Sequence, residues 1–252
     1  MGRVSNKVAI VTGGAQGIGA AYAKALAREG ARVVVADVKS GDAVVHEIVA
    51  SGGDAMSCIV DVAKTNSVEA MVEDAKARFG GVDVLVNNAA IFASLSFAPF
   101  DSISDEDWDA VMRVNVAGLF KCSRAVVGSM RERGGGKIVN ISSGTVFLGS
   151  QMLLHYVTSK AAVIGFTRAL ARELGPDRIC VNAIAPGFTE SEGVRSNASY
   201  TADVRARVQS VRAISRAQEP EDLIGALLLL ASQDGDFITG QTIVVDGGHA
   251  MH

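Results

Sequence analysis

The sequence predicts an α/β protein whose 252 residues form a single domain, residues 1–252, around a doubly wound parallel sheet of about seven strands. Three observations support this fold class. Short runs rich in β-branched residues alternate with longer segments of helical periodicity along the whole chain. Most of these runs are apolar at consecutive positions, which is typical of strands covered by helices on both faces. Apolar residues make up 48% of the chain, which supplies enough material for one large core.

The expected strands follow one another along the chain. They are Val8–Val11, Arg32–Ala36, Met56–Val60, Val82–Val86, Lys137–Ile141, Ile179–Ala183 and Thr242–Val245. Between the strands lie segments of helical spacing, of which the clearest are Ile18–Arg28, Ser67–Phe79, Glu106–Met130 and Tyr156–Leu174. This regular alternation requires crossover connections, which are right-handed in nearly all parallel sheets, and it places helices on both faces of the sheet. Residues 187–212 break the rhythm and predict a long polar connection, which is typical of a substrate-binding loop or of a mobile surface insertion with a solvated helix.

Charge and composition disfavour several classes of function. The formal net charge is −3, so no basic surplus is available for a nucleic-acid backbone. The longest apolar run near the end, Leu223–Ala231, is too short for a bilayer, which needs about 20 residues. The three cysteines are widely spaced and have no ligand-type neighbours, as expected for reduced thiols in a cytoplasmic protein without a metal site. We therefore expect no nucleic-acid, membrane or metal partner.

A glycine-rich turn, TGGAQGIG at 12–19, connects the first strand to the first helix. Glycines allow positive φ and a close approach of the backbone to a ligand, and a helix N-terminus offers free N–H groups to a diphosphate. Glycines also serve ordinary turns. The strand–turn–helix context nevertheless favours a dinucleotide site of the Rossmann type.

Asp37, which closes the second strand, bears on the choice between NAD and NADP. An acid at this position can hydrogen-bond the adenosine ribose and repel a 2′-phosphate, although strand-end aspartates also cap helices. Gln16 in the glycine turn carries no charge, which also favours NAD. Lys39 is the nearest basic residue after the acid and argues against that choice. NAD is the cofactor we expect.

Tyr156 and Lys160 are four residues apart on a predicted helix and therefore share one face. A free phenol has a pKa of about 10, so it needs help to act as a base near neutral pH. A fixed ammonium, together with the positive ring of an oxidised nicotinamide, would lower that pKa. The pair could also lie on the protein surface without a function. Ser142 and Ser143 end the fifth strand, where an open α/β sheet binds ligands, and a hydroxyl there could contact a substrate oxygen or cap a helix.

These motifs occur together in one family, the short-chain dehydrogenases/reductases, which the chain resembles over essentially its whole length. The matching stretches are TGGAQGIG at 12–19, Asp61-Val62, NNAA at 87–90, RVNVAG at 113–118, NISS at 140–143, YVTSK at 156–160, PG at 186–187 and ITGQTIVVDGG at 238–248. Each stretch is modest, but their order and spacing are specific. The overall likeness is greatest to bacterial NAD-dependent secondary alcohol dehydrogenases that act on 1-phenylethanol or cyclic alcohols.

The resemblance implies a catalytic tetrad of Asn115, Ser143, Tyr156 and Lys160. Ser143, thirteen positions before Tyr156, has the family's spacing. Tyr156 would act as acid and base in a hydride transfer between the cofactor and a carbinol carbon, while Ser143 would steady the substrate oxygen. Lys160 would lower the pKa of Tyr156 and bind the nicotinamide ribose. Asn115 would hold a water in a proton relay from Lys160.

The resemblance also implies the residues of the cofactor site. They are Gly13, Gln16, Gly17, Ile18, Gly19, Asp37, Asp61, Val62, Asn88, Ala89, Ala90, Tyr156, Lys160, Pro186, Gly187, Thr189 and Ser191. Two of them depart from the family pattern. Ala90 stands where glycine is usual, which adds a methyl near the cofactor, and Ser191 stands where threonine is common, which keeps the hydroxyl.

For the substrate we expect contacts from Ser143, Thr145, Leu153, Tyr156 and Phe188, with Ile91, Phe92, Val146, Phe147 and Met152 as further wall candidates. The set is largely apolar and suits a hydrophobic, cyclic or aromatic secondary alcohol or ketone. Arg195 or Arg205 could instead reach an acidic substrate group. A 3-oxoacyl thioester reductase and a non-catalytic NAD-binding protein stay open as alternatives, and the resemblance implies a homotetramer.

Overall fold

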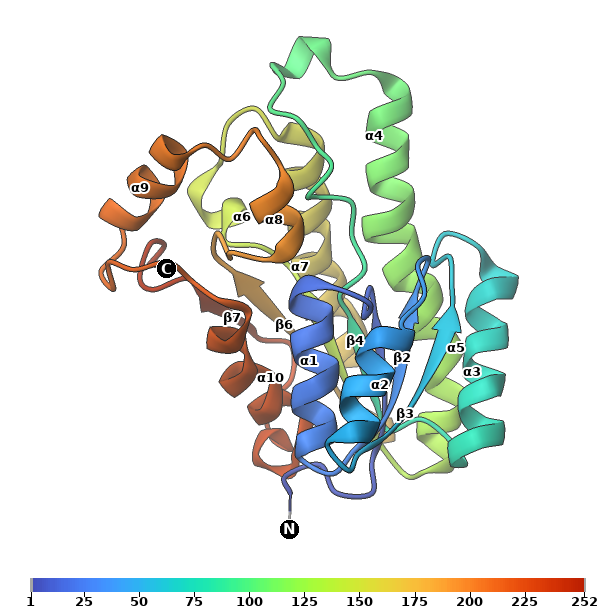
Figure 1. Ribbon diagram of the computed structural model, residues 1–252. Coiled ribbons are helices and arrows are strands. Elements are labelled where there is room, and N and C mark those ends of the chain that lie inside the picture. The colour runs from blue at the N-terminus through green and yellow to red at the C-terminus, as the bar shows by residue number, and fades with distance from the viewer. Residues whose placement is uncertain (1, 252) are drawn as a thin grey trace.

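The computed structural model describes residues 2–251 and contains one sheet of seven parallel strands, in the order β3-β2-β1-β4-β5-β6-β7 (Figure 1). The strands are β1 (Val8–Thr12), β2 (Arg32–Asp37), β3 (Asp54–Ile59), β4 (Val84–Asn87), β5 (Gly136–Ile141), β6 (Ile179–Pro186) and β7 (Thr242–Val245). The predicted fold class is confirmed, and each predicted strand is present with its ends shifted by no more than a few residues.

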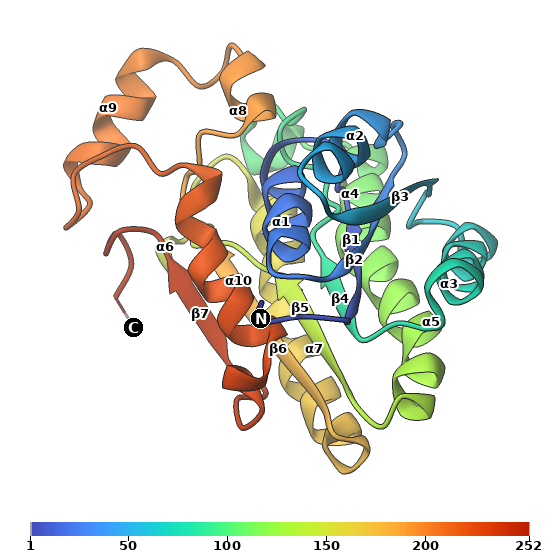
Figure 2. The same ribbon diagram turned by 60° about the horizontal axis from the view of Figure 1, so that its bottom comes forward.

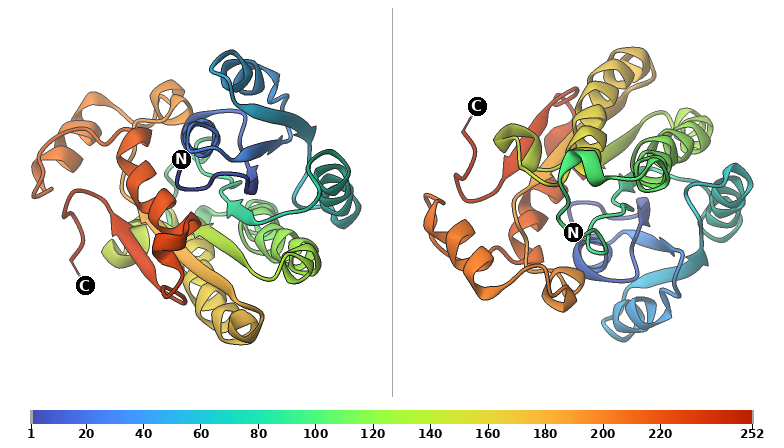
Figure 3. Two further views of the ribbon diagram at one scale, coloured as in Figure 1. Left: turned by 90° about the horizontal axis from the view of Figure 1, so that it is seen from below. Right: turned by 90° about the horizontal axis from the view of Figure 1, so that it is seen from above.

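Helices cover both faces of the sheet (Figures 2 and 3). One face carries α1 (Gly17–Arg28), α2 (Asp42–Ala50) and α10 (Ile224–Ala231), and the other carries α3 (Thr65–Phe79), α5 (Leu119–Glu132) and α7 (Leu154–Leu174). Alternate residues of β1 enter opposite cores: Ala9 and Val11 pack with α1 and α10, whereas Val8 and Ile10 pack with α3 and α5. Because side chains alternate along a strand, a strand with two cores must be apolar at every position.

The segment 106–130, predicted as one helix, is divided in the structure. It forms α4 (Asp105–Met112), a π-helical turn η2 (Arg113–Gly118) and α5. The wider turn brings Gly118 against Val62, where a side chain would come within 2.8 Å of a Val62 methyl. Apolar residues keep their helical spacing through this turn, so the sequence pattern did not indicate a break in the helix. The prediction of an unbroken helix is wrong for this reason.

Two other regions contain helices whose bounds the sequence pattern did not define, although a solvated helix within 187–212 was one of the two expectations for that segment. The helix α2 has a run of apolar residues with little periodicity, and the polar connection 187–212 contains α8 (Glu192–Ser196) and α9 (Ala202–Ser210). Both α8 and α9 begin with a side-chain cap, from Ser191 and Thr201 respectively. Because α8 and α9 are short and polar, a search for amphipathic periodicity does not detect them.

The carboxyl ends of the strands point toward the end of the molecule where α6 (Thr145–Leu148), α8 and α9 lie, opposite the N-terminus (Figure 1). The strand order reverses between β1 and β4. In open α/β sheets, the carboxyl ends of the strands at such a switch point are where ligands are generally bound. None of the helices within residues 2–251 is both long and apolar enough to span a membrane.

Candidate active site

The glycine-rich turn after β1 brings the main chain of the turn into close contact with the start of α1. Gly13 and Gly17 have positive φ, +64° and +56°, which favours glycine. A methyl group on Gly19 would overlap the carbonyl oxygen of Gly13, so α1 can approach the turn only with glycine there. The N-cap residue Gln16 makes no side-chain capping bond, and the first turn of α1 contains no acid. The first N–H groups of α1 and the positive end of its dipole are therefore available to an anion.

The ends of β1 and β4 are joined by a small polar network. The hydroxyl oxygen of Thr12 accepts hydrogen bonds from the N–H groups of Asn88 and Ala89, both at 3.1 Å. The side-chain amide of Asn88 donates to the carbonyl oxygens of Thr12 and Gly13, both at 3.0 Å. These bonds fix Asn88 and Ala89 against the glycine turn, and the neighbouring Ala90 is exposed.

Asp37 lies beside this turn at the end of β2. Its carboxylate accepts hydrogen bonds from the N–H groups of Ala15 and Lys39, both at 3.1 Å. The ammonium of Lys39 donates to the side-chain oxygen of Gln16 at 3.0 Å. A carboxylate and a cation thus lie together where the adenosine ribose is expected. The structure therefore strengthens the argument from Lys39 against strict selection of NAD.

Asp61 and Val62 follow β3, the edge strand next to β2. The Asp61 carboxylate accepts a hydrogen bond from the N–H of Ala63 at 3.0 Å and pairs with Lys64 at 3.2 Å. Val62 is buried against Gly118. A main-chain bond of 2.7 Å from the N–H of Val60 to the carbonyl oxygen of Asp37 joins the ends of β2 and β3. Asp61 and Val62 therefore lie next to Asp37, at the same end of the sheet.

The segment after β6 forms the opposite wall. Pro186 ends β6, and a side chain on Gly187 would come within 2.7 Å of Asp246, so glycine is needed there. The hydroxyl of the buried Thr189 donates to the Gly187 carbonyl at 3.0 Å. Ser191 faces the glycine turn, because a methyl on Gly17 would lie 3.3 Å from the Ser191 Cβ. Free helix N–H groups, a tight glycine turn and an acid at the ribose position together fit a dinucleotide.

Tyr156 and Ser143 meet at the carboxyl end of β5. Tyr156 lies in the first turn of α7, and the nearby Ser143 hydroxyl acts to lower the pKa of its phenol. The Ser143 oxygen accepts two hydrogen bonds from Thr145, one from its hydroxyl at 2.9 Å and one from its N–H at 3.2 Å. Because both acceptor positions of Ser143 are used, its own proton is left to donate to the phenol, which favours the phenolate. Thr145, expected to line the substrate site, thus orients Ser143.

Lys160 lies one helical turn after Tyr156 on α7. Its ammonium donates to the carbonyl oxygen of Ile141 at 2.7 Å and lies 5.8 Å from the centre of the Tyr156 ring. The hydroxyl of Ser142 donates to the main-chain carbonyl of Lys160 at 2.8 Å. The two adjacent serines therefore have different neighbours: Ser142 joins β5 to α7, and Ser143 faces the phenol.

Asn115 lies in the π-helical turn η2 and is buried. Its side-chain oxygen accepts from the N–H of Ile91 at 2.8 Å, and its amide donates to the carbonyl of Ile91 and to the Ser159 hydroxyl at 3.2 and 3.0 Å. Asn115 thus reaches α7 through Ser159 rather than through Lys160 itself. A water held by Asn115 in a proton relay stays a prediction.

Burial dominates the acid–base properties of the two central residues. It raises the pKa of Tyr156 above the usual range for a phenol, and the hydrogen bond from Ser143 opposes this rise. Burial also lowers the pKa of Lys160 to about 8. The lowered phenol pKa expected from the sequence therefore stays a prediction for the protein in the presence of an oxidised nicotinamide.

Four aromatic residues pack together and reach Tyr156 through Phe92, and we call them the aromatic cluster: Phe92, Phe97, Phe188 and Tyr200. The Phe92 ring packs on Tyr156 at 4.7 Å between centroids, and the Tyr200 ring lies 5.9 Å from Phe92, 5.5 Å from Phe97 and 5.1 Å from Phe188. Sequence analysis proposed Phe92 and Phe188 but missed Phe97 and Tyr200, which no motif marks. Leu153, the N-cap residue of α7, is buried.

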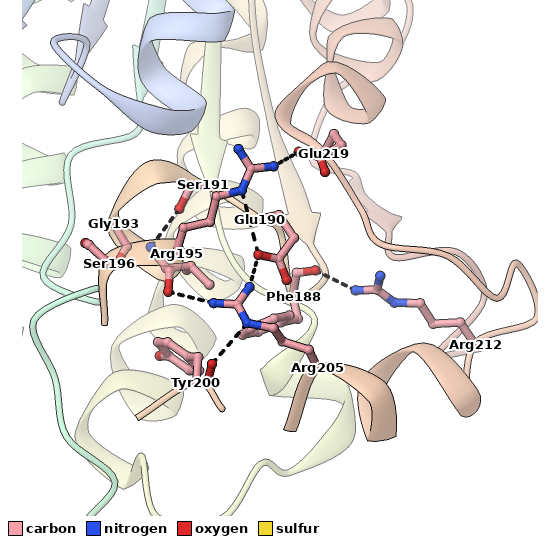
Figure 4. Close-up of polar contacts among 11 residues, drawn as sticks. Phe188, Glu190, Ser191, Gly193, Arg195, Ser196, Tyr200, Arg205, Arg212 and Glu219 are labelled. Atoms are coloured by element: carbon pink, nitrogen blue, oxygen red, sulfur yellow. Dashed lines mark hydrogen bonds and ion pairs between the residues drawn. The ribbon is translucent and has the colours of Figure 1, made fainter. Parts of the chain in front are cut away.

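Ion pairs hold the segment 187–212 in place (Figure 4). Glu190, which is buried, pairs with Arg205, and Arg195 pairs with Glu219 at 2.6 Å. Arg205 also donates to the carbonyl oxygens of Tyr200 and Val194, and Arg212 donates to that of Phe188. Since Arg195 and Arg205 are already paired with carboxylates, the structure disfavours their use for an acidic substrate group. Within residues 2–251, no group of three side chains is placed to bind a metal ion.

Comparison with known proteins agrees with this geometry. A family model described as enoyl-(acyl carrier protein) reductase matches residues 13–250. An uncharacterized oxidoreductase of Mycobacterium tuberculosis is 47% identical over 98% of both chains. A 3-oxoacyl-[acyl-carrier-protein] reductase of Synechocystis is 37% identical over 100% of both. The crystal structure of a short-chain type dehydrogenase/reductase from Mycobacterium marinum superposes with a TM-score of 0.90 and 35% identity, covering 98% of this chain and 96% of the other.

Proposed function

This chain belongs to the short-chain dehydrogenase/reductase family, and we propose that it is an NAD-dependent oxidoreductase that interconverts a secondary alcohol and a ketone. One observation carries the proposal. Ser143, Tyr156 and Lys160 converge at the carboxyl end of β5, at the same end of the sheet as the switch point between β1 and β4. A base, an oxygen-binding hydroxyl and a cation at a dinucleotide site are what oxidation of a carbinol requires.

Different residues of the chain would bind different parts of the cofactor. Gly13, Gly17 and Gly19 would hold the diphosphate at the start of α1, and Asp37 would hold the adenosine ribose. The segment from Gly187 to Ser191 would hold the nicotinamide half, as the resemblance to the family implies, and its residue Ser191 lies against Gly17 of the glycine turn. When bound, the oxidised nicotinamide supplies the hydride acceptor and a positive charge.

Tyr156 then takes the proton from the substrate hydroxyl, and it returns that proton in the direction of reduction. Ser143 steadies the substrate oxygen, and its hydrogen bond strengthens as negative charge develops there. Thr145 keeps the Ser143 proton directed away from itself. Lys160 favours the phenolate and binds the nicotinamide ribose, and Asn115 holds a water that connects Lys160 to solvent.

For the cofactor we propose NAD rather than NADP. Asp37 supports this choice, because its carboxylate would repel a 2′-phosphate at the position where it would have to lie. The substrate we propose is a hydrophobic, cyclic or aromatic alcohol or ketone. The aromatic cluster supports this choice, since it presents large apolar surfaces beside Tyr156.

The experiment that tests the proposal measures NADH formation with a panel of secondary alcohols, and NADH and NADPH oxidation with the matching ketones and a 3-oxoacyl thioester. We expect turnover of cyclic or aromatic substrates with NAD(H). Faster reduction of the thioester with NADPH would favour the 3-oxoacyl reductase alternative, which the name of the Synechocystis relative supports. NADH binding without turnover of any substrate would favour a non-catalytic protein.

We also propose a homotetramer in the cytoplasm. Cys58 and Cys122 are buried free thiols and Cys180 is partly exposed and free, which supports a reducing compartment. Sedimentation equilibrium of the purified protein tests the assembly, for which a mass near four chains is expected, and a monomer would contradict it.

A further inference from the structure

Glu190 is a buried acid within the segment that would hold the nicotinamide half of the cofactor. It lies between Thr189 and Ser191 and is 7% exposed. A carboxylate that is removed from water needs a charged partner and hydrogen bonds to remain ionised. Arg205 of α9 is that partner, and Arg195 lies further away, with its Nε 3.9 Å from a Glu190 carboxylate oxygen (Figure 4). The position of Glu190 is therefore tied to that of Arg205.

The guanidinium of Arg205 joins several parts of the connection that follows β6. Besides pairing with Glu190, it donates to the carbonyl oxygen of Val194 in α8 at 3.1 Å and to that of Tyr200 at 3.0 Å. Its central carbon also lies 6.0 Å from the centre of the Phe188 ring. A single side chain of α9 thus contacts residues that come before and after the proposed nicotinamide-binding hydroxyls.

Ser191, the residue after Glu190, connects this ion pair to the glycine turn. A methyl group on Gly17 would lie 3.3 Å from the Ser191 Cβ, so the two residues are in contact. The Ser191 hydroxyl also caps α8 by accepting a hydrogen bond from the N–H of Val194 at 3.4 Å. Val194 is the residue whose carbonyl oxygen binds Arg205. A displacement of Arg205 would therefore move Ser191 in two ways, through Glu190 and through α8.

We propose that Glu190 and Arg205 are positioning residues for the nicotinamide half of the cofactor. The ion pair holds Thr189 and Ser191 where they contact that half, and neither charged side chain needs to touch the cofactor itself. This inference rests on the proposed dinucleotide-dependent function. Because the glycine turn and Asp37 would bind the adenosine diphosphate half, loss of the ion pair should weaken binding of the nicotinamide half alone.

The test compares the binding of NADH with that of ADP-ribose, which has the same diphosphate charge but no nicotinamide. Calorimetric titration gives the Kd of each ligand. In Glu190→Gln, which keeps the shape of the side chain and removes its charge, we expect the Kd for NADH to rise about tenfold and the Kd for ADP-ribose to change less than about twofold. Net charge alone would have the opposite effect, because removing a negative charge favours both anionic ligands. Arg205→Met should also weaken NADH binding more than ADP-ribose binding.

Glu219→Gln is the matched control. It makes the same chemical change in an acid that pairs with Arg195, but the Glu219 side chain is 41% exposed, whereas that of Glu190 is 9% exposed. Exposed ion pairs contribute little to stability, so we expect both Kd values to stay at those of the wild-type protein. The double variant Glu190→Gln/Arg205→Met should weaken NADH binding no more than Arg205→Met does, because the two residues act as one pair.

Several outcomes would overturn the inference. An unchanged Kd for NADH in Glu190→Gln and Arg205→Met would leave the ion pair without a role in cofactor binding. Equal weakening of NADH and ADP-ribose binding, or loss of both in a variant that does not fold, would assign the pair to the stability of the domain. All of these outcomes require a wild-type protein that binds the two ligands. A wild-type protein that binds neither would overturn the proposed function and, with it, this inference.

Discussion

At the scale of single residues, Tyr156 and Lys160 illustrate how burial competes with charge. The sequence placed them on one helical face and suggested that the ammonium makes the phenol acidic. The structure adds that both groups are buried, which raises the pKa of Tyr156 and lowers that of Lys160 to about 8. The hydrogen bond from Ser143 is the contact that opposes the rise of the Tyr156 pKa. The Ser143 hydroxyl has one proton, so it faces the Tyr156 phenol in the ligand-free protein and would donate to the substrate oxygen in the complex that we propose.

Tyr156→Phe removes the proposed acid–base group and changes little else, since the ring still packs on Phe92. We expect kcat to fall by about a thousandfold or more, while NADH binding is kept. Steady-state kinetics and NADH fluorescence titration measure the two quantities. Substantial activity in this variant would remove Tyr156 from its assigned role.

Asp37→Ala removes the carboxylate that would repel a 2′-phosphate, and the ammonium of Lys39 remains nearby on Gln16. We expect the ratio of kcat/KM with NADP to that with NAD to rise about tenfold or more. The double variant Asp37→Ala/Lys39→Met should lose most of this gain, because the attracting cation is then absent. A ratio that stays at the wild-type value in both variants would place cofactor discrimination elsewhere in the site.

At the scale of elements, the junction of β1 and α1 depends on close backbone contact. Gly19→Ala would force α1 away from the carbonyl of Gly13, so we expect the free energy of unfolding to fall by about 1–3 kcal/mol and NADH binding to weaken. Gly128→Ala in α5 is the control, since a methyl there meets no atom within 4 Å in the described structure. Alanine is the better helix former, so this control should gain up to about 1 kcal/mol. Urea unfolding compares the two, and equal effects would contradict the proposed close contact.

Other elements depend on contacts between distant parts of the chain. The π-helical turn η2 places the Asn115 side chain against Ile91 and Ser159, and the ion pairs of Glu190 and Arg205 order α8 and α9. Neither feature has a periodic pattern in the sequence. Each is stabilised by partners that only the folded chain brings together.

At the scale of the whole molecule, burying Lys160 makes stability depend on pH. The pKa of Lys160 falls from 10.5 to about 8 on folding. Between these values the unfolded chain binds one more proton than the folded chain, so the free energy of unfolding rises with pH, by at most about 1.4 kcal/mol per pH unit. Below about pH 8 both states are protonated, and the full cost of burying the charge is present.

Lys160→Met removes this contribution. We expect the wild-type protein to gain stability relative to the variant as the pH rises from about 8 to about 10. Urea unfolding of both proteins at several pH values gives the difference directly. Parallel curves would show that the Lys160 side chain does not carry a buried charge below pH 8.

The amino-acid pattern predicted the fold class, which the structure confirms, and it supplied most of the residues that we propose for the site. Strands with two apolar faces, the glycine turn and the four-residue spacing of Tyr156 and Lys160 are local patterns, and they follow from side-chain periodicity and backbone freedom over a few neighbouring residues. The choice of Ser143 came from the resemblance to the family. The tertiary structure alone decided which residues surround these groups. Three such contacts are the hydrogen bond of Lys39 to Gln16, the orientation of Ser143 by Thr145 and the burial of the Tyr200 hydroxyl. They depend on the folded structure, because desolvation and hydrogen bonding depend on distance in space and not on distance along the sequence.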